Sequence, residues 1–118
     1  MNAYELQALR HVFGMTVTEC ADWIAPDDGV TAWHEWESGE REIPANVVEQ
    51  MQEMRRKRKI HRNALIKKIN DRIGNNTMRF FPDLVTFQTV YSDGNFLDWK
   101  IYQSVAAELY ADDLEHLC

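Results

Sequence analysis

The 118-residue sequence has only two cysteines, Cys20 and Cys118, which is too few for a disulfide framework. It has no apolar run near the roughly 18 residues that cross a bilayer. Its first residues, MNAYELQALR, lack the apolar segment of a secretory signal peptide. These absences argue against a disulfide-rich secreted protein and a helical membrane protein. They predict a reduced, cytoplasmic protein that has no membrane partner.

Common catalytic and cofactor motifs are also missing. The sequence contains no GxSxG, P-loop, GxGxxG, HExxH or CxxC pattern. His61 has no second histidine or cysteine four residues away, which is the spacing of a metal pair on a helix. We therefore expect no enzyme activity, no cofactor and no metal site.

Positive charge is scarce at the start of the chain and concentrated in its middle. Residues 1–46 carry two basic residues against nine acidic ones, a net charge of −7. Residues 47–81 carry ten against three, or +7, and residues 82–118 carry one against seven, or −6. Because neutralised phosphates supply much of the affinity for nucleic acid, the acidic first segment is unusual for a DNA-binding surface.

Helix-capping and turn residues divide residues 16–44 into two short helices. Thr16 and Glu19 have capping-box spacing at the start of a helix over residues 17–24. The APDDG loop follows, in which Asp27 or Asp28 can cap a helix over residues 29–38. Gly39 is suited to end this second helix.

Apolar residues spaced three and four apart predict the inward faces of these helices. They are Cys20, Trp23 and Ile24 in the first helix, and Val30, Trp33 and Trp36 in the second. A longer helix is expected on each side, one over residues 3–13 with Asn2 as its cap and one that starts near Pro44. Two short helices joined tightly and framed in this way indicate a helix-turn-helix.

Three blocks of sequence resemble a known family. The run WESGEREIP resembles the end of the recognition helix of lambda-repressor-like domains, which often read W-E-x-G-x-x-x-I-P. The blocks ELQALR, AWHEWESG and WKIYQSVAAELY are similar, in this order, to YdiL-like helix-turn-helix proteins, which include anti-CRISPR-associated repressors. The resemblance is collinear over nearly the whole chain.

The residue patterns and the resemblance together predict a mainly α protein with a lambda-repressor-like helix-turn-helix bundle, a long linking helix and a small C-terminal α+β part with one short strand. It implies a dimeric transcriptional repressor whose C-terminal part dimerises, and some relatives also bind RNA. It further implies that Arg10 pairs inside the protein with Glu37 of the WE dipeptide. A phosphate contact is the other interpretation of Arg10.

In this arrangement the helix over residues 29–38 is the recognition helix for double-stranded DNA. Its expected outward residues are Thr31, Ala32, His34, Glu35 and Ser38, whose polar groups can read base edges. The helix has no Lys or Arg, so phosphate contacts are expected from elsewhere. The candidates are Thr16 and Thr18 at a helix N-terminus, Arg41, and the basic residues Arg55, Arg56 and Lys57.

The fourth helix, which starts near Pro44, is expected to be very long. No Gly or Pro occurs from residue 45 to residue 73, and apolar residues keep near-heptad spacing except where Arg58 and His61 interrupt. The run RRKRK at 55–59 is either a solvated face or a contact for a nucleic-acid backbone. Gly74-Asn75-Asn76 is the clearest break. We expect a helix-turn-helix domain over residues 1–58 and a dimerisation region over residues 59–118.

The C-terminal part is expected to hold a strand over residues 77–81 and no convincing second strand. Asp83 caps a helix over residues 84–91, and a last helix spans residues 97–110. The apolar face of that helix exceeds what so short a segment can cover, and a lone strand is unstable. We therefore predict a homodimer through residues 77–110.

Three functions stay open from the sequence. The first is a dimeric DNA-binding repressor, as the resemblance implies. The second is a protein-interaction module that has kept the helix-turn-helix but lost DNA affinity, which the acidic segment favours. The third is RNA binding through the basic run at 55–62.

Overall fold

The computed structural model describes residues 1–71 and 76–118, and this part of the chain is mainly helical, with one small two-stranded sheet. It divides into two compact units, Met1–Arg55 and Arg56–Cys118. The division falls inside the long helix α4, Ala45–Asp71. The expected domains over residues 1–58 and 59–118 stay a prediction.

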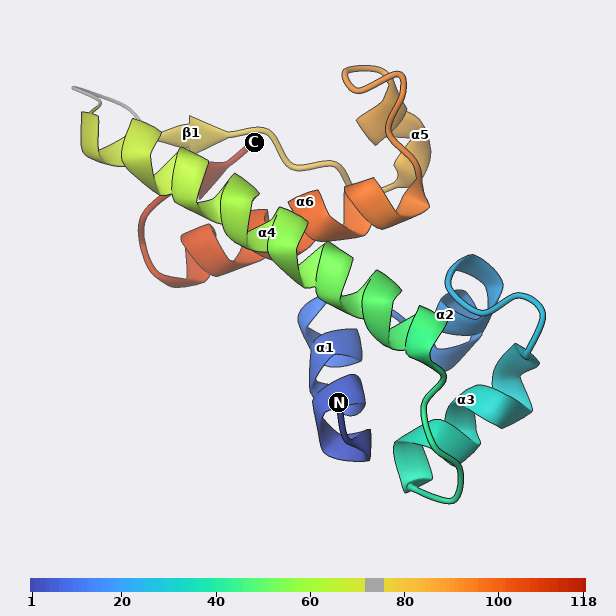
Figure 1. Cartoon of the computed structure of the whole chain (residues 1–118). Helices are drawn as coiled ribbons and strands as arrows, with labels where there is room; N and C mark the ends of the chain where they lie inside the picture. The colour runs from blue at the N-terminus through green and yellow to red at the C-terminus, as the bar shows by residue number, and fades with distance from the viewer. Residues whose placement is uncertain (72–75) are drawn as a thin grey trace. The chain divides into compact units, whose positions relative to one another are not determined.

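Three short helices and the beginning of α4 build the first unit (Figure 1). They are α1 (Ala3–Val12), α2 (Val17–Trp23) and α3 (Gly29–Ser38). Asn2 and Thr16 each form a complete capping box, because each side chain accepts a backbone N–H three residues on while a glutamate caps in return. Gly39 ends α3 in the left-handed conformation with φ 82°, which glycine adopts without strain.

The predicted cap of α3 is wrong. Asp28 precedes the helix with helical backbone angles, and its side chain makes no capping hydrogen bond. The backbone N–H groups of Asp28 and Gly29 donate instead to the carbonyl of Ala25, at 3.1 Å each. The loop thus satisfies its donors through a backbone turn, and both carboxylates of Asp27 and Asp28 stay on exposed residues.

Large apolar side chains fill the centre of the first unit. Fully buried residues come from all four helices, and they are Leu6, Phe13, Cys20, Ile24, Trp33, Trp36, Val47 and Met51. Two predicted inward residues lie elsewhere, since Trp23 is 43% exposed and Val30 is 37% exposed.

Both errors have the same geometric cause. The buried stripe of α2 and its C-terminal end consists of Cys20, Ala21, Ile24 and Ala25. The stripe of α3 consists of Ala32, Trp33, Trp36 and Glu37. Each stripe therefore follows the spacing i, i+1, i+4 and i+5 and leaves the neighbouring Trp23 and Val30 at its edge. Ala32, which was expected to face outward, is buried.

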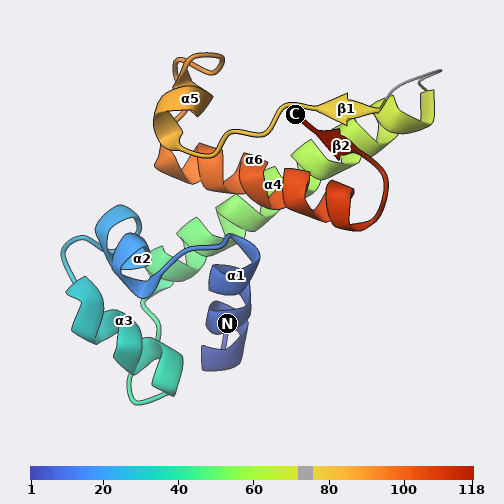
Figure 2. The ribbon, with the colours of Figure 1, turned by 180° about the vertical axis from the view of Figure 1, so that it is seen from behind.

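The second unit combines the rest of α4 with α5 (Leu84–Gln88), α6 (Phe96–Ala111) and the parallel strands β1 (Thr77–Met78) and β2 (His116–Leu117). Figure 2 shows β2 beside β1, next to the C-terminus. The prediction that β1 has no partner strand is wrong, because Thr77 pairs with His116 and Met78 pairs with Leu117. The crossover that a parallel pair requires runs through α5 and α6.

The C-terminal helices are close to the expected ranges. Asp83 caps α5 by accepting from the N–H of Thr86 at 2.8 Å, but α5 ends at Gln88 and Tyr91 is 45% exposed. Ile73, Gly74 and Asn75 of the expected helix end and breaker lie outside the described residues.

The apolar face of α6 is mostly covered within one chain. Its buried residues are Phe96, Trp99, Ile101, Tyr102, Val105, Ala106 and Leu109, together with Lys100. The ammonium of Lys100 lies 4.7 Å from the ring centroid of Trp99. This cation–π contact helps to stabilise the charge among apolar residues. We expected α6 to leave apolar surface uncovered, but most of its apolar residues are buried within the chain.

Candidate nucleic-acid interface

The outward side of α3 carries a short row of polar residues. Thr31, His34 and Ser38 are exposed, and they lie three and four positions apart, so they share one face of the helix. The hydroxyl of Ser38 is partly engaged, because it donates to the carbonyl of Glu35 at 3.1 Å. Thr31 and His34 are thus the polar side chains of α3 best suited to reach a ligand.

Glu35 is committed to a neighbour. Its carboxylate forms an ion pair with Arg41 at 2.8 Å, and the side chains are 27% and 61% exposed. The pair holds one cation near the C-terminal end of α3, although the helix itself has none. Because Arg41 is largely exposed, its guanidinium can also meet an anion without leaving this position.

The N-terminus of α2 carries the other predicted contacts. Thr16 and Thr18 are both exposed. The hydroxyl of Thr16 accepts from the N–H of Glu19 at 3.1 Å, and the Glu19 carboxylate accepts from the N–H of Thr16 at 2.9 Å. A carboxylate thus already occupies this helix end, which favours negative charge. Thr18 takes no part in this capping box, so its hydroxyl is more accessible to a phosphate than that of Thr16.

A buried ion pair holds the two ends of the bundle together. Arg10 of α1 donates from Nε to Glu37 Oε2 at 2.7 Å and from Nη2 to Glu37 Oε1 at 3.0 Å. The side chains are 18% and 9% exposed. The hydrogen bond to Glu37 raises the pKa of Arg10, although burial opposes this effect. The structure therefore contains the pair expected from the sequence, and Arg10 is engaged inside the protein.

Several further groups complete the surroundings of Glu37. Its carboxylate accepts from Nε1 of Trp33, and its backbone carbonyl accepts from the side chain of Gln7 at 2.8 Å. Arg10 also donates to the carbonyl of Met15 at 3.2 Å, ahead of α2. Trp33 and Glu37 lie four residues apart on one helix, so the contact between them could have been predicted from the sequence. The contact of Gln7 with Glu37 could not, because the two residues lie far apart in the sequence.

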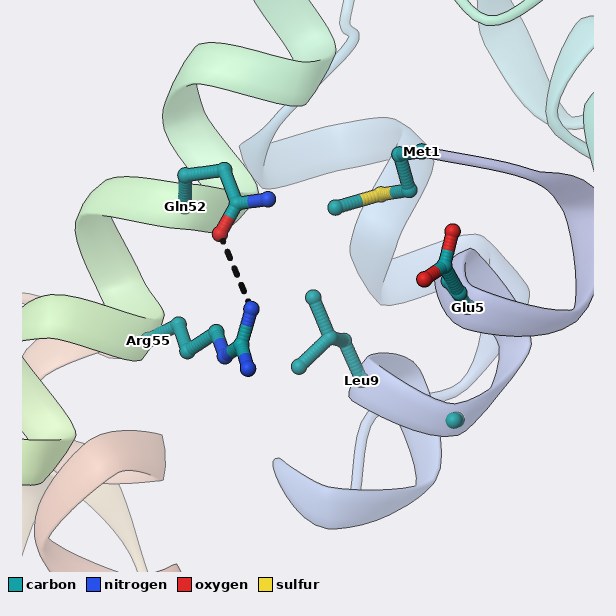
Figure 3. Close-up of a pocket in the computed structure, with 6 residues that line it drawn as sticks. Met1, Glu5, Leu9, Gln52 and Arg55 are labelled. Carbon is teal, nitrogen blue, oxygen red and sulfur yellow. Dashed lines mark hydrogen bonds between the residues drawn. The ribbon is translucent and has the colours of Figure 1, made fainter.

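An open hollow lies in the first unit near the basic run. Its volume is about 260 Å³, and Met1, Glu5, Leu9, Gln52 and Arg55 line it (Figure 3). The Arg55 guanidinium donates to the amide oxygen of Gln52 at 3.4 Å, one turn earlier on α4. Glu5 faces the same hollow and also closes the capping box of Asn2. Arg55 is therefore an exposed residue at the edge of a hollow that also contains the carboxylate of Glu5.

The basic run divides into exposed and inward residues. Arg55, Arg56, Lys57 and Lys59 are exposed. Arg58 instead donates to Ser104 at 3.0 Å and to Glu108 at 2.9 Å on α6, and Arg62 also donates to Glu108. The run is therefore partly a solvated face and partly the attachment of α6 to α4.

This network changes the ionisation of Glu108. Burial raises the pKa of this carboxyl, but the hydrogen bonds and charges of Arg62 and Arg58 outweigh burial and lower it. Arg58 and Glu108 are 19% and 26% exposed, so the ion pair lies largely out of water. A group of three charges that are held together in this way is consistent with a structural role.

Neither a metal-ligating cluster nor a membrane-spanning helix is found in the described part of the chain. Residues 1–71 and 76–118 contain no group of three or more His, Cys, Asp or Glu side chains placed to hold a metal ion. No helix among the described residues is long and apolar enough to cross a membrane.

The chain matches known proteins over its whole length. A family model described as Aca2/YdiL-like matches residues 1–118. The uncharacterized protein YdiL of Escherichia coli (strain K12) is 68% identical over 118 residues, which cover 100% of both chains. The Aca2 repressor of Pectobacterium phage ZF40 is 31% identical over 113 residues, which cover 95% of both chains.

Proposed function

Because the chain belongs to the Aca2/YdiL-like family, which includes a phage repressor, we propose that it is a DNA-binding transcriptional repressor. The observation that supports this most is the exposed polar row of Thr31, His34 and Ser38 on the second helix of a helix-turn-helix. In the proposed complex this helix, α3, lies in the major groove.

Base recognition in this proposal relies on neutral hydrogen-bonding groups. Hydroxyl, imidazole and methyl groups can read base edges, whereas the common arginine contact to guanine is unavailable from α3. Glu35 can accept from a base as well, but one of its carboxylate oxygens is already paired with Arg41. Discrimination between sequences is therefore expected to be modest at each base pair.

Phosphate contacts come from outside α3. We assign them to Thr16 and Thr18 at the start of α2, to Arg41, and to Arg55, Arg56 and Lys57 on α4. All of these residues are exposed. Their exposure supports the assignment, because a phosphate contact needs a side chain that can leave water for an anion.

Fluorescence anisotropy tests the proposal directly. The full chain is titrated into a duplex taken from upstream of its own gene, with an unrelated duplex of equal length as the control, at salt concentrations from about 50 to 200 mM. We expect tighter binding to the upstream duplex and a loss of affinity as salt rises. Equal affinity for both duplexes, or no binding at the lowest salt, would contradict a sequence-specific repressor.

We also propose that the protein forms a homodimer through residues 77–110. Within this range Val85 of α5 is 74% exposed and Val90 just after α5 is 50% exposed, so apolar surface remains here even though β1 and α6 are satisfied within one chain. A two-fold interface would bury this surface on both subunits. Sedimentation of the chain as a monomer at roughly tens of micromolar, a range set by typical affinities, would argue against it.

A second candidate is a protein-interaction module without DNA affinity. The observation that favours it is the acidic surround of the helix-turn-helix, where Asp22, Asp27 and Asp28 are exposed and Glu19 occupies the start of α2. These carboxylates repel phosphate. Failure of every duplex and of a matching RNA to bind in the anisotropy experiment would favour this candidate. Selective binding of the RNA would instead favour the basic run at 55–62 as an RNA contact.

A further inference from the structure

A small cavity in the second unit has a lining that the helix-turn-helix does not use. Its volume is about 210 Å³, and it lies among α4, the segment around α5, and α6. Three aromatic rings and three polar side chains supply most of its wall, and these are Phe87, Tyr91, Tyr102, Lys57, His61 and Asp98.

The aromatic wall is ordered. The rings of Phe87 and Tyr91 stack with centroids 4.9 Å apart and planes 26° apart. The Tyr102 ring is inclined to Tyr91 by 51° at 5.7 Å, and its hydroxyl donates to the carbonyl of Arg79 at 2.6 Å. That hydroxyl is already used, and burial raises the pKa of Tyr102 to about 12, so the ring presents an uncharged surface.

His61 contributes an uncharged ring to the wall. Its Nε2 is buried, and it has no hydrogen-bond partner in the part of the chain that the structure describes. Burial, followed by the charge of Lys68, lowers the pKa of His61, so the imidazole is neutral at pH 7. Because Nε2 is closed off from water, a ligand in the pocket meets the neutral ring of His61 rather than this nitrogen.

The two charged residues of the wall, Asp98 and Lys57, differ in whether they can pair with a ligand. The carboxylate of Asp98 accepts from the N–H of Asn95 at 3.0 Å in the capping box of α6. Lys57 is exposed, and it belongs to the basic run of α4. The free charge that a ligand meets at this cavity is therefore the ammonium of Lys57, which favours an anion.

The volume of the pocket suits a ligand with one ring. A dry cavity of about 150 Å³ is enough for benzene, whereas drug-sized ligands need about 300 Å³ or more. The cavity of about 210 Å³ lies between these values. It can hold a six-membered ring with one small polar substituent.

We propose that this cavity binds a single-ring aromatic carboxylate. The ring lies against Tyr91 and Tyr102, and the carboxylate meets the ammonium of Lys57. The site belongs to the second unit alone. It shares Lys57 with the proposed phosphate contacts, so ligand binding is tested on the chain without DNA. A regulator with such a site can respond to a small metabolite.

Nuclear magnetic resonance of the full chain, titrated with benzoate, tests the site. We expect saturable shifts of the resonances of His61, Tyr91 and Tyr102, with a Kd on the order of 1–10 mM for a ligand of this size. Cyclohexanecarboxylate keeps the charge but loses the flat ring, and benzylamine reverses the charge. Each should bind at least about threefold more weakly, as expected when aromatic contact or charge pairing is lost.

Two matched lysine variants separate the site from general attraction. Lys57→Gln should weaken benzoate binding by about threefold, whereas Lys59→Gln, which alters an exposed lysine two residues away, should change it by less than about 1.5-fold. Both lysines are exposed, so both variants should keep the fold. Equal effects of the two variants would overturn the assignment of the carboxylate to Lys57.

Other results would overturn the proposal as a whole. These are the absence of localised shifts up to roughly 50 mM benzoate, well above the expected Kd, equal binding of cyclohexanecarboxylate, or tighter binding of benzylamine. If the same resonances move when the protein alone is concentrated, a second copy of the chain covers the cavity and the ligand site is excluded.

Discussion

At the scale of single residues, Arg10 and Glu37 illustrate how a charge is stabilised in the interior. Each Glu37 oxygen accepts at least one hydrogen bond, and Arg10 also donates to the carbonyl of Met15. A buried ion pair gains little over apolar residues when it is intact, but removal of one partner leaves an uncompensated charge. The pair therefore matters most when it is broken from one side.

Replacement of Arg10 should destabilise the first unit. Arg10→Ala leaves the Glu37 carboxylate buried with Trp33 as its side-chain donor, so we expect the free energy of unfolding to fall by about 1–4 kcal/mol. Urea denaturation followed by tryptophan fluorescence measures this. Arg41→Ala removes an exposed partner of Glu35 and should cost less than about 0.5 kcal/mol. Equal melting of Arg10→Ala and the parent would contradict the role of the pair.

The two cysteines should differ sharply in reactivity. Cys20 is fully buried, and burial raises the pKa of its thiol to about 12, so almost no thiolate forms at pH 7–8. Cys118 is exposed. Iodoacetamide should therefore modify Cys118 in the folded protein and reach Cys20 only after denaturation, as peptide mass spectrometry would show. Early labelling of Cys20 would mean that the first unit opens readily.

At the scale of elements, Glu108 joins α6 to α4 through Arg58 and Arg62. The pKa of Glu108 is lowered from its ordinary value of 4.5, since its two arginine partners outweigh burial. A carboxyl with a lowered folded-state pKa adds stability above its unfolded pKa, and this contribution is lost as pH falls through the folded-state value. The link between the two helices should therefore weaken only in acid.

The variant Glu108→Gln should show how much this ionic link contributes to stability. At pH 7 we expect the free energy of unfolding to fall by about 1–2 kcal/mol, because a neutral amide replaces a carboxylate that accepts from two arginines. The difference from the parent should shrink as pH falls below 4.5, where Glu108 itself becomes protonated. Glu49→Gln, which alters an exposed glutamate of α4, serves as the control. A difference that does not change with pH would contradict the ionic link.

The elements that could be predicted from the sequence are those with local causes. The capping boxes of Asn2 and Thr16, the end of α3 at Gly39 and the cap of α5 at Asp83 each depend on residues a few positions apart. The strand β2 could not be predicted, because two residues carry no periodicity and their partner lies far away in the chain. Local patterns therefore reveal element ends better than long-range pairing.

The candidate site follows the same division. The exposure of Thr31, His34 and Ser38 was predictable from helical spacing around Trp33 and Trp36. The engagement of Glu35 by Arg41 was not predicted, because it depends on the turn that follows Gly39. Apolar spacing also misled at Ala32, since the inward stripe of α3 includes a charged residue, Glu37, that only its partner Arg10 explains.

At the scale of the whole molecule, charge is arranged so that the helix-turn-helix is acidic while α4 is basic. Residues 1–46 have a net charge of −7 and residues 47–81 a net charge of +7. Part of the basic charge is neutralised inside the second unit, where Arg58 and Arg62 meet Glu108. If the chain binds DNA as proposed, the exposed cations of α4 carry most of the attraction to phosphate, and α3 supplies discrimination.

Two sets of variants should separate these contributions. Replacement of Arg55, Arg56 and Lys57 by Ala removes three exposed cations, so affinity should fall by a similar factor for the upstream and unrelated duplexes. The slope of log K against log salt should flatten by up to about 3 units. Replacement of His34 and Ser38 by Ala should instead lower affinity for the upstream duplex alone, by about 1–3 kcal/mol.

A control on the same helix makes the comparison sharp. Lys67→Ala also removes an exposed cation of α4, outside the residues that we assign to DNA. It should leave the salt slope within about 0.5 unit of the parent, because a cation that does not meet phosphate releases no counterion. If the triple variant binds as the parent does, the run at 55–59 is only a solvated face. If Lys67→Ala flattens the slope as much as each residue of the triple variant, the attraction comes from the whole basic helix rather than from a defined contact.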